Sequence, residues 1–407
     1  MEYYGGSIPW LKTGDLNDGF INSVSEYITK EGFNNSSVVL NPVGSVLIAM
    51  YGATIGKLGI TNIEVTTNQA CCACLPIIII NHYLFYFLMY QKKYFIEKAV
   101  GGAQPNISKE KIVATLFPVP PLREQKELVS MINKLISKID SIASCKNEIE
   151  NIIAITKSRI LDLAIRGKLV PQDPNDEPAS VLLERIRAEK EELIKQGKIK
   201  RDKKKSVIFK GEDNSYYEKI GDRIMNIDDE IPFEVPDNWS WCRGYSCFKG
   251  IESTKPQGEF FDYIDIDSID NRLHRIKKPK HLLVSDAPSR ANRSVKNGSV
   301  LFSLVRPYLE NIALIEEKYS HCIASTGFYV CNSNGAFLPE FMFYLMISGY
   351  VVGGLNQYMK GDNSPSINKD NIEGWLYPIP PIKEQKKIFT KLQTVFAMIE
   401  SVEKGLN

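Results

Sequence analysis

Apolar side chains recur in alternating steps of four and three over a long stretch in the middle of the chain. Such a ladder is typical of the seam of a coiled coil. It predicts one continuous helix over residues 124–165, ended by Gly167 and roughly 60 Å long at about 1.5 Å per residue. The ladder consists of Leu128, Ile132, Leu135, Ile139, Ile142, Lys146, Ile149, Ile153, Thr156, Ile160 and Leu163.

A second ladder with the same spacing lies near the end of the chain, from Ile388 to Val402. A helix with an apolar seam needs a partner that covers the seam. We expect the two helices to pair with each other and so to bring distant parts of the chain together. An intermolecular coiled coil is the alternative.

Both ladders follow nearly the same sequence. Residues 117–126 (FPVPPLREQK) return at 377–386 (YPIPPIKEQK), and residues 105–112 return at 365–372. A repeat offset by 260 residues is too large for one unit of a solenoid, which has roughly 50 residues at most. The sequence therefore predicts a duplicated module, a globular part followed by a helix that begins after a Pro-Pro step.

The globular parts alternate short apolar runs with glycine and asparagine turns. Strands are predicted at 44–50, at 71–80 (with 77–80 as a buried strand) and at 298–304, and an amphipathic helix at about 82–98. A polar helix is predicted at about 179–196. The basic run at 198–205 is typical of a solvated linker, with phosphate contact as the alternative.

These patterns predict an α+β fold. It has two mixed α/β globular domains separated by long antiparallel coiled-coil helices, with an internal pseudo-twofold repeat. The first domain is expected to be shortened at its start, because fewer residues precede its matching segment. The predicted parts are a first domain at 1–121, a helical spacer at 122–206, a second domain at 207–381 and a distal helix at 382–407.

Composition fits a globular protein without a membrane span. The chain has 43% hydrophobic and 24% charged residues and a formal net charge of +2, so an anionic partner must be met by local basic patches. Eight cysteines without a signal peptide predict buried free thiols in a reducing cytoplasm. The cluster at Cys71, Cys72 and Cys74 lies in a predicted strand, which favours core packing over metal binding.

Catalytic motifs are missing from the sequence. It contains no dinucleotide, P-loop, nucleophile-elbow or zinc-protease signature, and the glycine-rich stretch at 52–59 has Leu58 where a P-loop needs Ser or Thr. None of the four histidines has ligand or triad spacing along the chain. We therefore predict that the chain is not an enzyme.

The sequence instead offers side chains suited to DNA. Seven of the ten residues at 272–281 are Arg, Lys or His, and Arg, Asn, Gln, Ser and Thr on loops suit phosphate contact and base reading. A merely solvated basic face is the alternative. The predicted DNA-binding residues are Lys12, Thr13, Tyr51, Lys57, Asn68, Gln69, Gln104, Asn106, Arg275, Lys277, Lys278, Arg290, Arg293, Arg306, Ser325, Thr326 and Asn363.

Five segments together resemble the specificity (S) subunit of type I restriction–modification systems. Residues 4–16 (YGGSIPWLKTGDL) resemble an early recognition-domain motif, and the PVPPLREQ segment and its twin at 378–385 resemble the start of the conserved regions. Residues 167–180 (GKLVPQDPNDEPAS) resemble the central conserved region, and 231–239 (IPFEVPDNW) the start of a second recognition domain. The likeness covers essentially the whole chain.

This resemblance implies that two target-recognition domains each read half of a split double-stranded DNA site. It implies that the helices dock two modification subunits, which methylate adenine with S-adenosylmethionine, and that ATP- and Mg-dependent restriction subunits join them. No cofactor or metal is expected on this chain. Two other functions remain open: a coiled-coil scaffold whose globular modules do not bind DNA, and the recognition part of a fused nuclease–methyltransferase.

Overall fold

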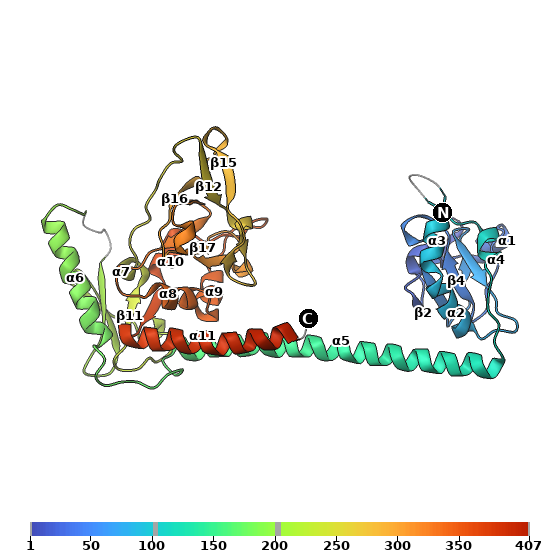
Figure 1. The fold of residues 1–407 in the computed structure, drawn as a ribbon, viewed down its shortest axis with the longest axis horizontal. Coiled ribbons are helices and arrows are strands. Elements are labelled where there is room, and N and C mark those ends of the chain that lie inside the picture. Colours follow the sequence, from blue (N-terminus) through green and yellow to red (C-terminus); the bar gives the residue numbers. More distant parts are fainter. Residues whose placement is uncertain (1, 101–104, 200–204, 406–407) are drawn as a thin grey trace. The chain divides into compact units, whose positions relative to one another are not determined.

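The computed structural model describes residues 2–100, 105–199 and 205–405 (Figure 1). The chain divides into two compact units, residues 1–145 and 146–407. Each unit combines small sheets with helices, so the α+β fold is confirmed. The predicted four-part division at 121, 206 and 381 stays a prediction.

Unit 1 is built around strand β4 (Val46–Ala49), which is buried on both faces. Val46 and Ile48 belong to one apolar cluster, and Leu47 and Ala49 to another on the opposite face. Its sheets have the orders β3-β1-β6 and β2-β5-β4-β7. The other elements are β1 Tyr4–Leu11, η1 Thr13–Asp15, β2 Gly19–Ile21, β3 Glu26–Ile28, α1 Lys30–Asn34, η2 Gly52–Thr54, β5 Leu58–Thr61, β6 Thr66–Thr67, β7 Cys71–Cys74, α2 Asn81–Tyr90, α3 Lys92–Lys98 and α4 Lys109–Val113.

Unit 2 repeats this arrangement around β17 (Val300–Ser303), whose side chains also alternate between two apolar clusters. Its main sheets are β18-β17-β20 and β15-β12-β19-β16. Its strands are β8 Ser206–Lys210, β9 Tyr216–Ile220, β10 Arg223–Asn226, β11 Ser240–Arg243, β12 Phe260–Ile264, β13 Ile269–Asp270, β14 Arg275–Ile276, β15 Lys280–Leu283, β16 Ala291–Ser294, β18 Ile312–Leu314, β19 Ile323–Ser325, β20 Phe328–Cys331 and β21 Leu376–Ile379. Its helices are α6 Ala179–Lys195, η3 Asp228–Glu230, α7 Gly244–Cys247, η4 Ile266–Ser268, η5 Val284–Asp286, η6 Pro307–Leu309, η7 Glu317–Tyr319, α8 Pro339–Met346, α9 Gly349–Asn356, α10 Lys369–Gly374 and α11 Ile382–Gly405.

The internal repeat extends to individual backbone hydrogen bonds. Leu11 pairs with Thr67 in a parallel ladder, and Ile264 pairs with Ala324 in the same way. The N–H of Met50 donates to Ala70 O at 2.8 Å, as that of Leu304 does to Gly327 O. The two units therefore share one backbone plan although most of their side chains differ.

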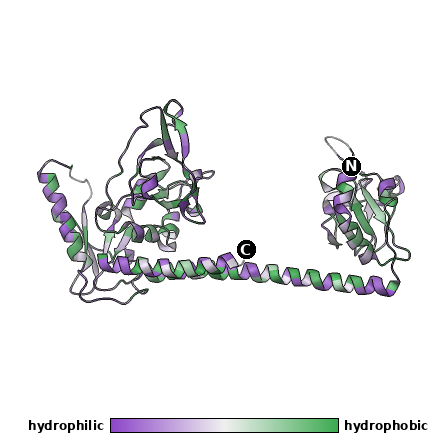
Figure 2. Ribbon diagram, viewed as in Figure 1, coloured by the Kyte–Doolittle hydropathy of each residue, from purple (hydrophilic) through white to green (hydrophobic). Residues whose placement is uncertain are grey.

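Helix α5 (Leu122–Ile165) is one continuous helix of 44 residues, as the ladder predicted. It begins directly after Pro121, and Gly167, with a φ of +68°, follows its end. The left-handed φ at Gly167 is a common helix stop because glycine has no Cβ to clash there. Figure 2 shows the apolar positions recurring along α5.

Within unit 2, α11 runs beside the last turns of α5 in the opposite direction (Figure 1). The Lys157 ammonium lies 2.8 Å from the Glu403 carboxylate. Leu161 and Ile165 pack in one cluster with Ile388 and Leu392. The predicted antiparallel pairing of the two helices is thus confirmed for these residues.

The predicted positions of the buried apolar seam are wrong near the C-terminal end of α5. Leu161, Ala164 and Ile165 are buried, whereas Leu163 is 40% exposed. An undistorted helix has 3.6 residues per turn and drifts away from a strict seven-residue repeat. The buried face has therefore moved one position along by the last two turns.

The predicted buried strand at 77–80 is also wrong. Strand β7 ends at Cys74, and Ile77 and Ile78 are 94% and 72% exposed. Pro76 has no N–H for a ladder, and the N–H of Ile80 donates to the Gln125 side chain instead of to a strand. The run of isoleucines is a connection between β7 and α2.

Four other expectations have simpler outcomes. The helix predicted at 82–98 is present but divided at Gln91 into α2 and α3. All eight cysteines are free, and Cys145 is exposed, contrary to the expectation of buried thiols. Residues 200–204 of the basic run lie outside the described residues. Across the parts of the chain that the structure describes, every helix is too short or too polar to cross a membrane.

Unit 1 lacks a described strand at residues 116–119, where unit 2 has β21 at the matching positions. Strand β21 is fully buried and pairs with β11, but the matching residues 116–119 form no strand. Leu116 is 91% exposed and Val119 54%. No described strand in unit 1 therefore takes the place that β11 has in unit 2.

Candidate nucleic-acid interface

In unit 1 the predicted DNA-binding residues meet at one edge of a sheet. Lys12 and Thr13 follow β1, and Asn68 and Gln69 follow β6, which is parallel to β1. Carboxyl ends of parallel strands lie at the same edge, and the N–H of Asn68 donates to Leu11 O at 3.2 Å. These four residues are therefore neighbours on two adjacent turns.

The remaining unit 1 residues adjoin this edge. Tyr51, near the start of the turn after β4, forms a backbone bridge with Asn106. Lys57 lies on the same turn, because its carbonyl accepts from Ala49 N–H at 2.9 Å. Tyr51 is 42% exposed, and Asn106 is exposed as well. Gln104 lies outside the described residues.

Two of these side chains have distinct electrostatic settings. The Lys12 ammonium forms an ion pair with Glu26 and lies 4.9 Å from the centroid of the Trp10 ring. The buried side-chain oxygen of Asn68 has no hydrogen-bond partner among the described residues. A buried polar atom without a partner is uncommon in folded proteins and marks Asn68 for attention.

Unit 2 forms the matching cluster from different residues. The N–H of Thr326 donates to Arg290 O at 2.8 Å, and the Arg306 guanidinium donates to Asn363 O at 2.9 Å. Val305 and Ser366 form a backbone bridge, as Tyr51 and Asn106 do in unit 1. Thr326, Arg306 and Asn363 therefore lie on turns that correspond to the unit 1 cluster, and Arg290 lies next to Thr326.

Ser325 and Arg293 are more buried than most of the residues on these turns. Ser325 is 4% exposed and its hydroxyl accepts from Gly327 N–H at 3.1 Å, so it shapes the turn that presents Thr326. Arg293 is half-buried on β16, and its Nε has no hydrogen-bond partner in the described parts of the chain.

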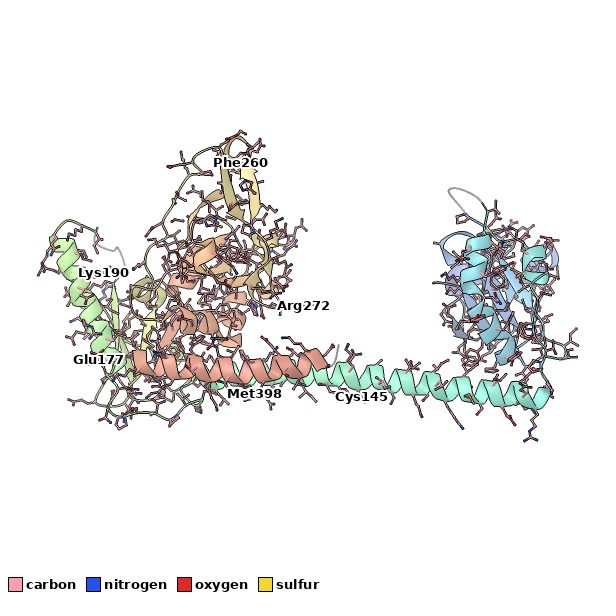
Figure 3. The ribbon with its side chains drawn as sticks, in the orientation of Figure 1. Cys145, Glu177, Lys190, Phe260, Arg272 and Met398 are labelled. Carbon is pink, nitrogen blue, oxygen red and sulfur yellow. The ribbon has the colours of Figure 1, made fainter. Side chains whose placement is uncertain are left out.

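The basic residues Arg275, Lys277 and Lys278 are exposed on a separate hairpin formed by β13 and β14. Figure 3 labels Arg272 at the turn of this hairpin. Hydrogen bonds from the backbone N–H groups of Leu273 and Arg272, helped by Lys277 and Arg275, lower the pKa of Asp270. The Asn271 amide donates to Leu309 O at 2.7 Å and so ties the hairpin to the turn that follows Arg306.

Sequence spacing did not reveal a cluster of Asp262, His281, His321 and Cys322. Asp262 on β12 lies directly opposite His281 on β15. The next residue, Tyr263, pairs with Ile323 on β19, so Asp262 also lies close to the residues just before β19. Hydrogen bonds with His281 and then His321 lower the pKa of Asp262, and burial raises the pKa of Cys322 to about 12. Only the strand pairing could have predicted this cluster, because its members are spread over 61 residues of sequence.

A profile of the type I restriction modification DNA specificity domain matches residues 2–151 and 251–407, about three quarters of the chain. The chain belongs to this family. Each matched segment contains one of the two polar loop clusters. The fold and the resemblance seen in the sequence are thereby confirmed.

Relatives with known names agree with this assignment. The chain is 30% identical over 253 residues to the EcoAI specificity subunit and 23% identical over 418 residues to the EcoDI specificity subunit, both of type I restriction enzymes from Escherichia coli. The first match covers 58% of this chain and 38% of the relative, the second 99% and 82%. The match to the EcoEI subunit covers 41% of that protein, so the chain spans about two fifths of the EcoAI and EcoEI subunits.

A solved structure, the HsdS subunit from Thermoanaerobacter tengcongensis, is 33% identical with a TM-score of 0.40. That match covers 42% of this chain and 46% of the HsdS chain. The S subunit from M. genitalium is 13% identical with a TM-score of 0.34 over 98% of this chain and 85% of its own.

Proposed function

We propose that this chain is the DNA sequence-specificity subunit of a type I restriction–modification complex and that it recognises a bipartite DNA target in the cytoplasm. In this proposal each unit reads one half-site through its polar loop cluster. The chain itself performs no catalysis and determines where its partner subunits act. S-adenosylmethionine, ATP and Mg²⁺ belong to those partners.

One observation carries the proposal: the same backbone plan presents different polar side chains in the two units. The ladder Leu11–Thr67 and its counterpart Ile264–Ala324 hold equivalent turns. Asn68 and Gln69 follow the unit 1 strand, whereas in unit 2 Ser325 is the last residue of β19 and Thr326 follows it. A shared frame with different side chains suits two readers of unlike half-sites.

The partnerless atoms of Asn68 and Arg293 support the same reading. Both belong to residues predicted for DNA contact, and both lie in these clusters or beside them. A base edge, a phosphate or an ordered water would satisfy either atom. The basic hairpin of unit 2 adds sequence-independent attraction to the DNA backbone.

Docking of two modification subunits is proposed for the exposed apolar ladder of α5. Leu135, Ile139 and Ile142 are 54%, 64% and 69% exposed, within a part of the helix that belongs to unit 1. Apolar side chains in a continuous helical stripe mark a surface for protein association. Restriction subunits would join the complex formed there.

Reconstitution with modification subunits tests the function. The complex is expected to bind double-stranded DNA with an affinity that falls steeply with salt and to methylate adenine within one split sequence. Uniform methylation of unrelated sequences, or binding that does not depend on salt, would instead favour the coiled-coil scaffold. Catalytically inactive modification subunits serve as the control for the methylation signal.

A further inference from the structure

The cluster of Asp262, His281, His321 and Cys322 lies in unit 2, on the four-stranded sheet that ends at Thr326. Its donor atoms come from three neighbouring strands or their flanks: β15, β12 and the residues just before β19. Figure 3 labels Phe260, the first residue of β12, beside the β15 strand. Nothing in the proposed DNA contacts uses these four side chains together.

The separations within the cluster are short. The Asp262 carboxylate lies 2.8 Å from Nδ1 of His281 through one oxygen and 2.9 Å from Nε2 of His321 through the other. The Cys322 sulfur lies 3.9 Å from the same His321 nitrogen. One donor atom each from Asp262, His321 and Cys322 fall within 4.8 Å of one another.

From these distances and donor types we propose that Asp262, His321 and Cys322 form a three-ligand zinc site, with His281 orienting the Asp262 carboxylate through their hydrogen bond. Zinc prefers a tetrahedral set of nitrogen, sulfur and carboxylate oxygen ligands at about 2.0–2.3 Å, which puts donor atoms roughly 3.3–3.8 Å apart. The sulfur–nitrogen distance of 3.9 Å lies just above this range, and the 2.9 Å between the Asp262 carboxylate and His321 would widen by about half an ångström. A thiolate with an imidazole favours zinc over magnesium or calcium, which prefer all-oxygen sites.

The surroundings of the cluster suit a metal ligand set. The His281 ring stacks on Phe260 at 5.1 Å with an interplanar angle of 8°, which fixes the direction of its nitrogens. Cys322 is 3% exposed, whereas the side chains of His281 and His321 are 67% and 60% exposed. The thiol thus forms the floor of the site and the imidazoles its open side.

A cavity of about 450 Å³ leads from solvent to the cluster and is lined in part by Asp262, His281, His321 and Cys322. An ion can therefore reach the ligands without the fold opening. The exposed Lys255 also lines this cavity, so a divalent ion would displace its ammonium group toward solvent. On binding, the Cys322 thiol releases its proton to water, and the neutral His321 imidazole binds through its unprotonated nitrogen.

A zinc ion here would join β12 to the start of β19. The far end of β19 leads directly into the turn that presents Thr326. The ion would therefore stabilise the frame of this turn rather than take part in any reaction. This role does not depend on whether unit 2 binds DNA.

Cobalt and zinc titration of the full, reduced, metal-free chain tests the proposal. One equivalent of Co²⁺ is expected to give visible bands of a tetrahedral site and a near-ultraviolet thiolate band, and Zn²⁺ should displace it and raise the thermal midpoint. His281→Ala and His321→Ala change exposed side chains and are expected to weaken binding at least about tenfold, as loss of even an indirect ligand contact does. Cys322→Ser should remove the thiolate band.

Two variants provide the controls. Cys145→Ser alters an exposed thiol on α5 and should leave the titration unchanged. Cys72→Ser probes the other cysteine cluster, at Cys71, Cys72 and Cys74. The proposal is overturned if the wild-type chain shows no saturable binding, if both histidine variants bind as the wild type does, or if Cys72→Ser instead abolishes the signal.

Discussion

The side-chain oxygen of Gln385 accepts a hydrogen bond from the backbone N–H of Leu338 at 2.7 Å. Gln125 accepts from Ile80 N–H at 2.9 Å in the first unit, so the same contact joins a helix start to each globular part. Each glutamine also donates to the carbonyl of the residue five positions before it, at 2.9 Å. The repeated REQ and KEQ segments are therefore structural joints, and both glutamines are essentially fully buried.

Replacing Gln385 with Ala should loosen unit 2. The change leaves the N–H of Leu338 and the carbonyls of Ala336 and Pro380 without their partner, and we expect a loss of about 2–4 kcal/mol of stability. Urea unfolding followed by tryptophan fluorescence measures it, because three of the four tryptophans are in unit 2. Gln393→Ala, an exposed change on the same helix, is the control. Equal urea midpoints for Gln385→Ala and Gln393→Ala would contradict the proposed role of Gln385.

Glu384 and Glu124 occupy the same repeated position in opposite surroundings. Glu384 is 1% exposed and accepts from Trp239 Nε1 at 3.0 Å and from Gln172 Nε2 at 2.7 Å, while Glu124 is exposed. Glu384→Gln replaces one accepting oxygen with an NH₂ group that faces a hydrogen-bond donor. We expect it to lower the free energy of unfolding by about 1–3 kcal/mol. Glu124→Gln should stay within about 0.5 kcal/mol of the wild type. A similar cost for both substitutions would argue against the buried contact.

The pH dependence of Glu384 has a definite sign. Burial is the main cause that raises the pKa of this carboxyl. A raised folded pKa means that the contribution of this group to stability is present below the ordinary carboxyl pKa and is lost as pH rises through the raised value. Across this pH window, the unfolding free energy of the wild type should fall as pH rises, while that of Glu384→Gln should not. The stability difference between the two proteins should therefore narrow with rising pH. A deficit that widens would refute this assignment.

The exposed ladder of α5 gives a prediction about assembly. Ile139→Asp combined with Ile142→Asp should leave the stability of the isolated chain within about 0.5 kcal/mol, because both side chains are already exposed. The same variant should lose co-purification with modification subunits. Ser137→Asp with Ser141→Asp adds equal charge at exposed positions outside the ladder and should retain it. Loss in both variants would point to charge rather than to the apolar stripe.

DNA affinity should depend on one basic residue from each cluster. Lys57→Ala and Arg290→Ala are each expected to reduce the slope of log affinity against log salt by about 1, as the loss of one phosphate contact does. Arg123→Ala, on the 92% exposed arginine of α5, should leave the slope unchanged. A fluorescence anisotropy titration of the assembled complex at several salt concentrations measures all three.

The sequence was most informative where one periodicity extended over many residues. Helix α5 followed from the spacing of apolar residues, and the starts of α5 and α11 followed from the repeated Pro-Pro step. The strand prediction at 77–80 was wrong because apolar composition alone cannot distinguish a buried strand from an exposed connection. In this connection the backbone N–H of Ile80 donates to a side chain and not to a neighbouring strand. The His281–Asp262–His321 contacts could not be predicted because they depend on the register of three strands.

The central claim is that each unit reads its own half of a split DNA site. The most direct test maps methylated adenines for complexes carrying Gln69→Ala or Thr326→Ala, the exposed and half-buried residues after β6 and β19. Gln69→Ala should relax the sequence requirement in one half-site only, and Thr326→Ala in the other only. Relaxation of the same half-site by both variants, or of neither, would contradict the account.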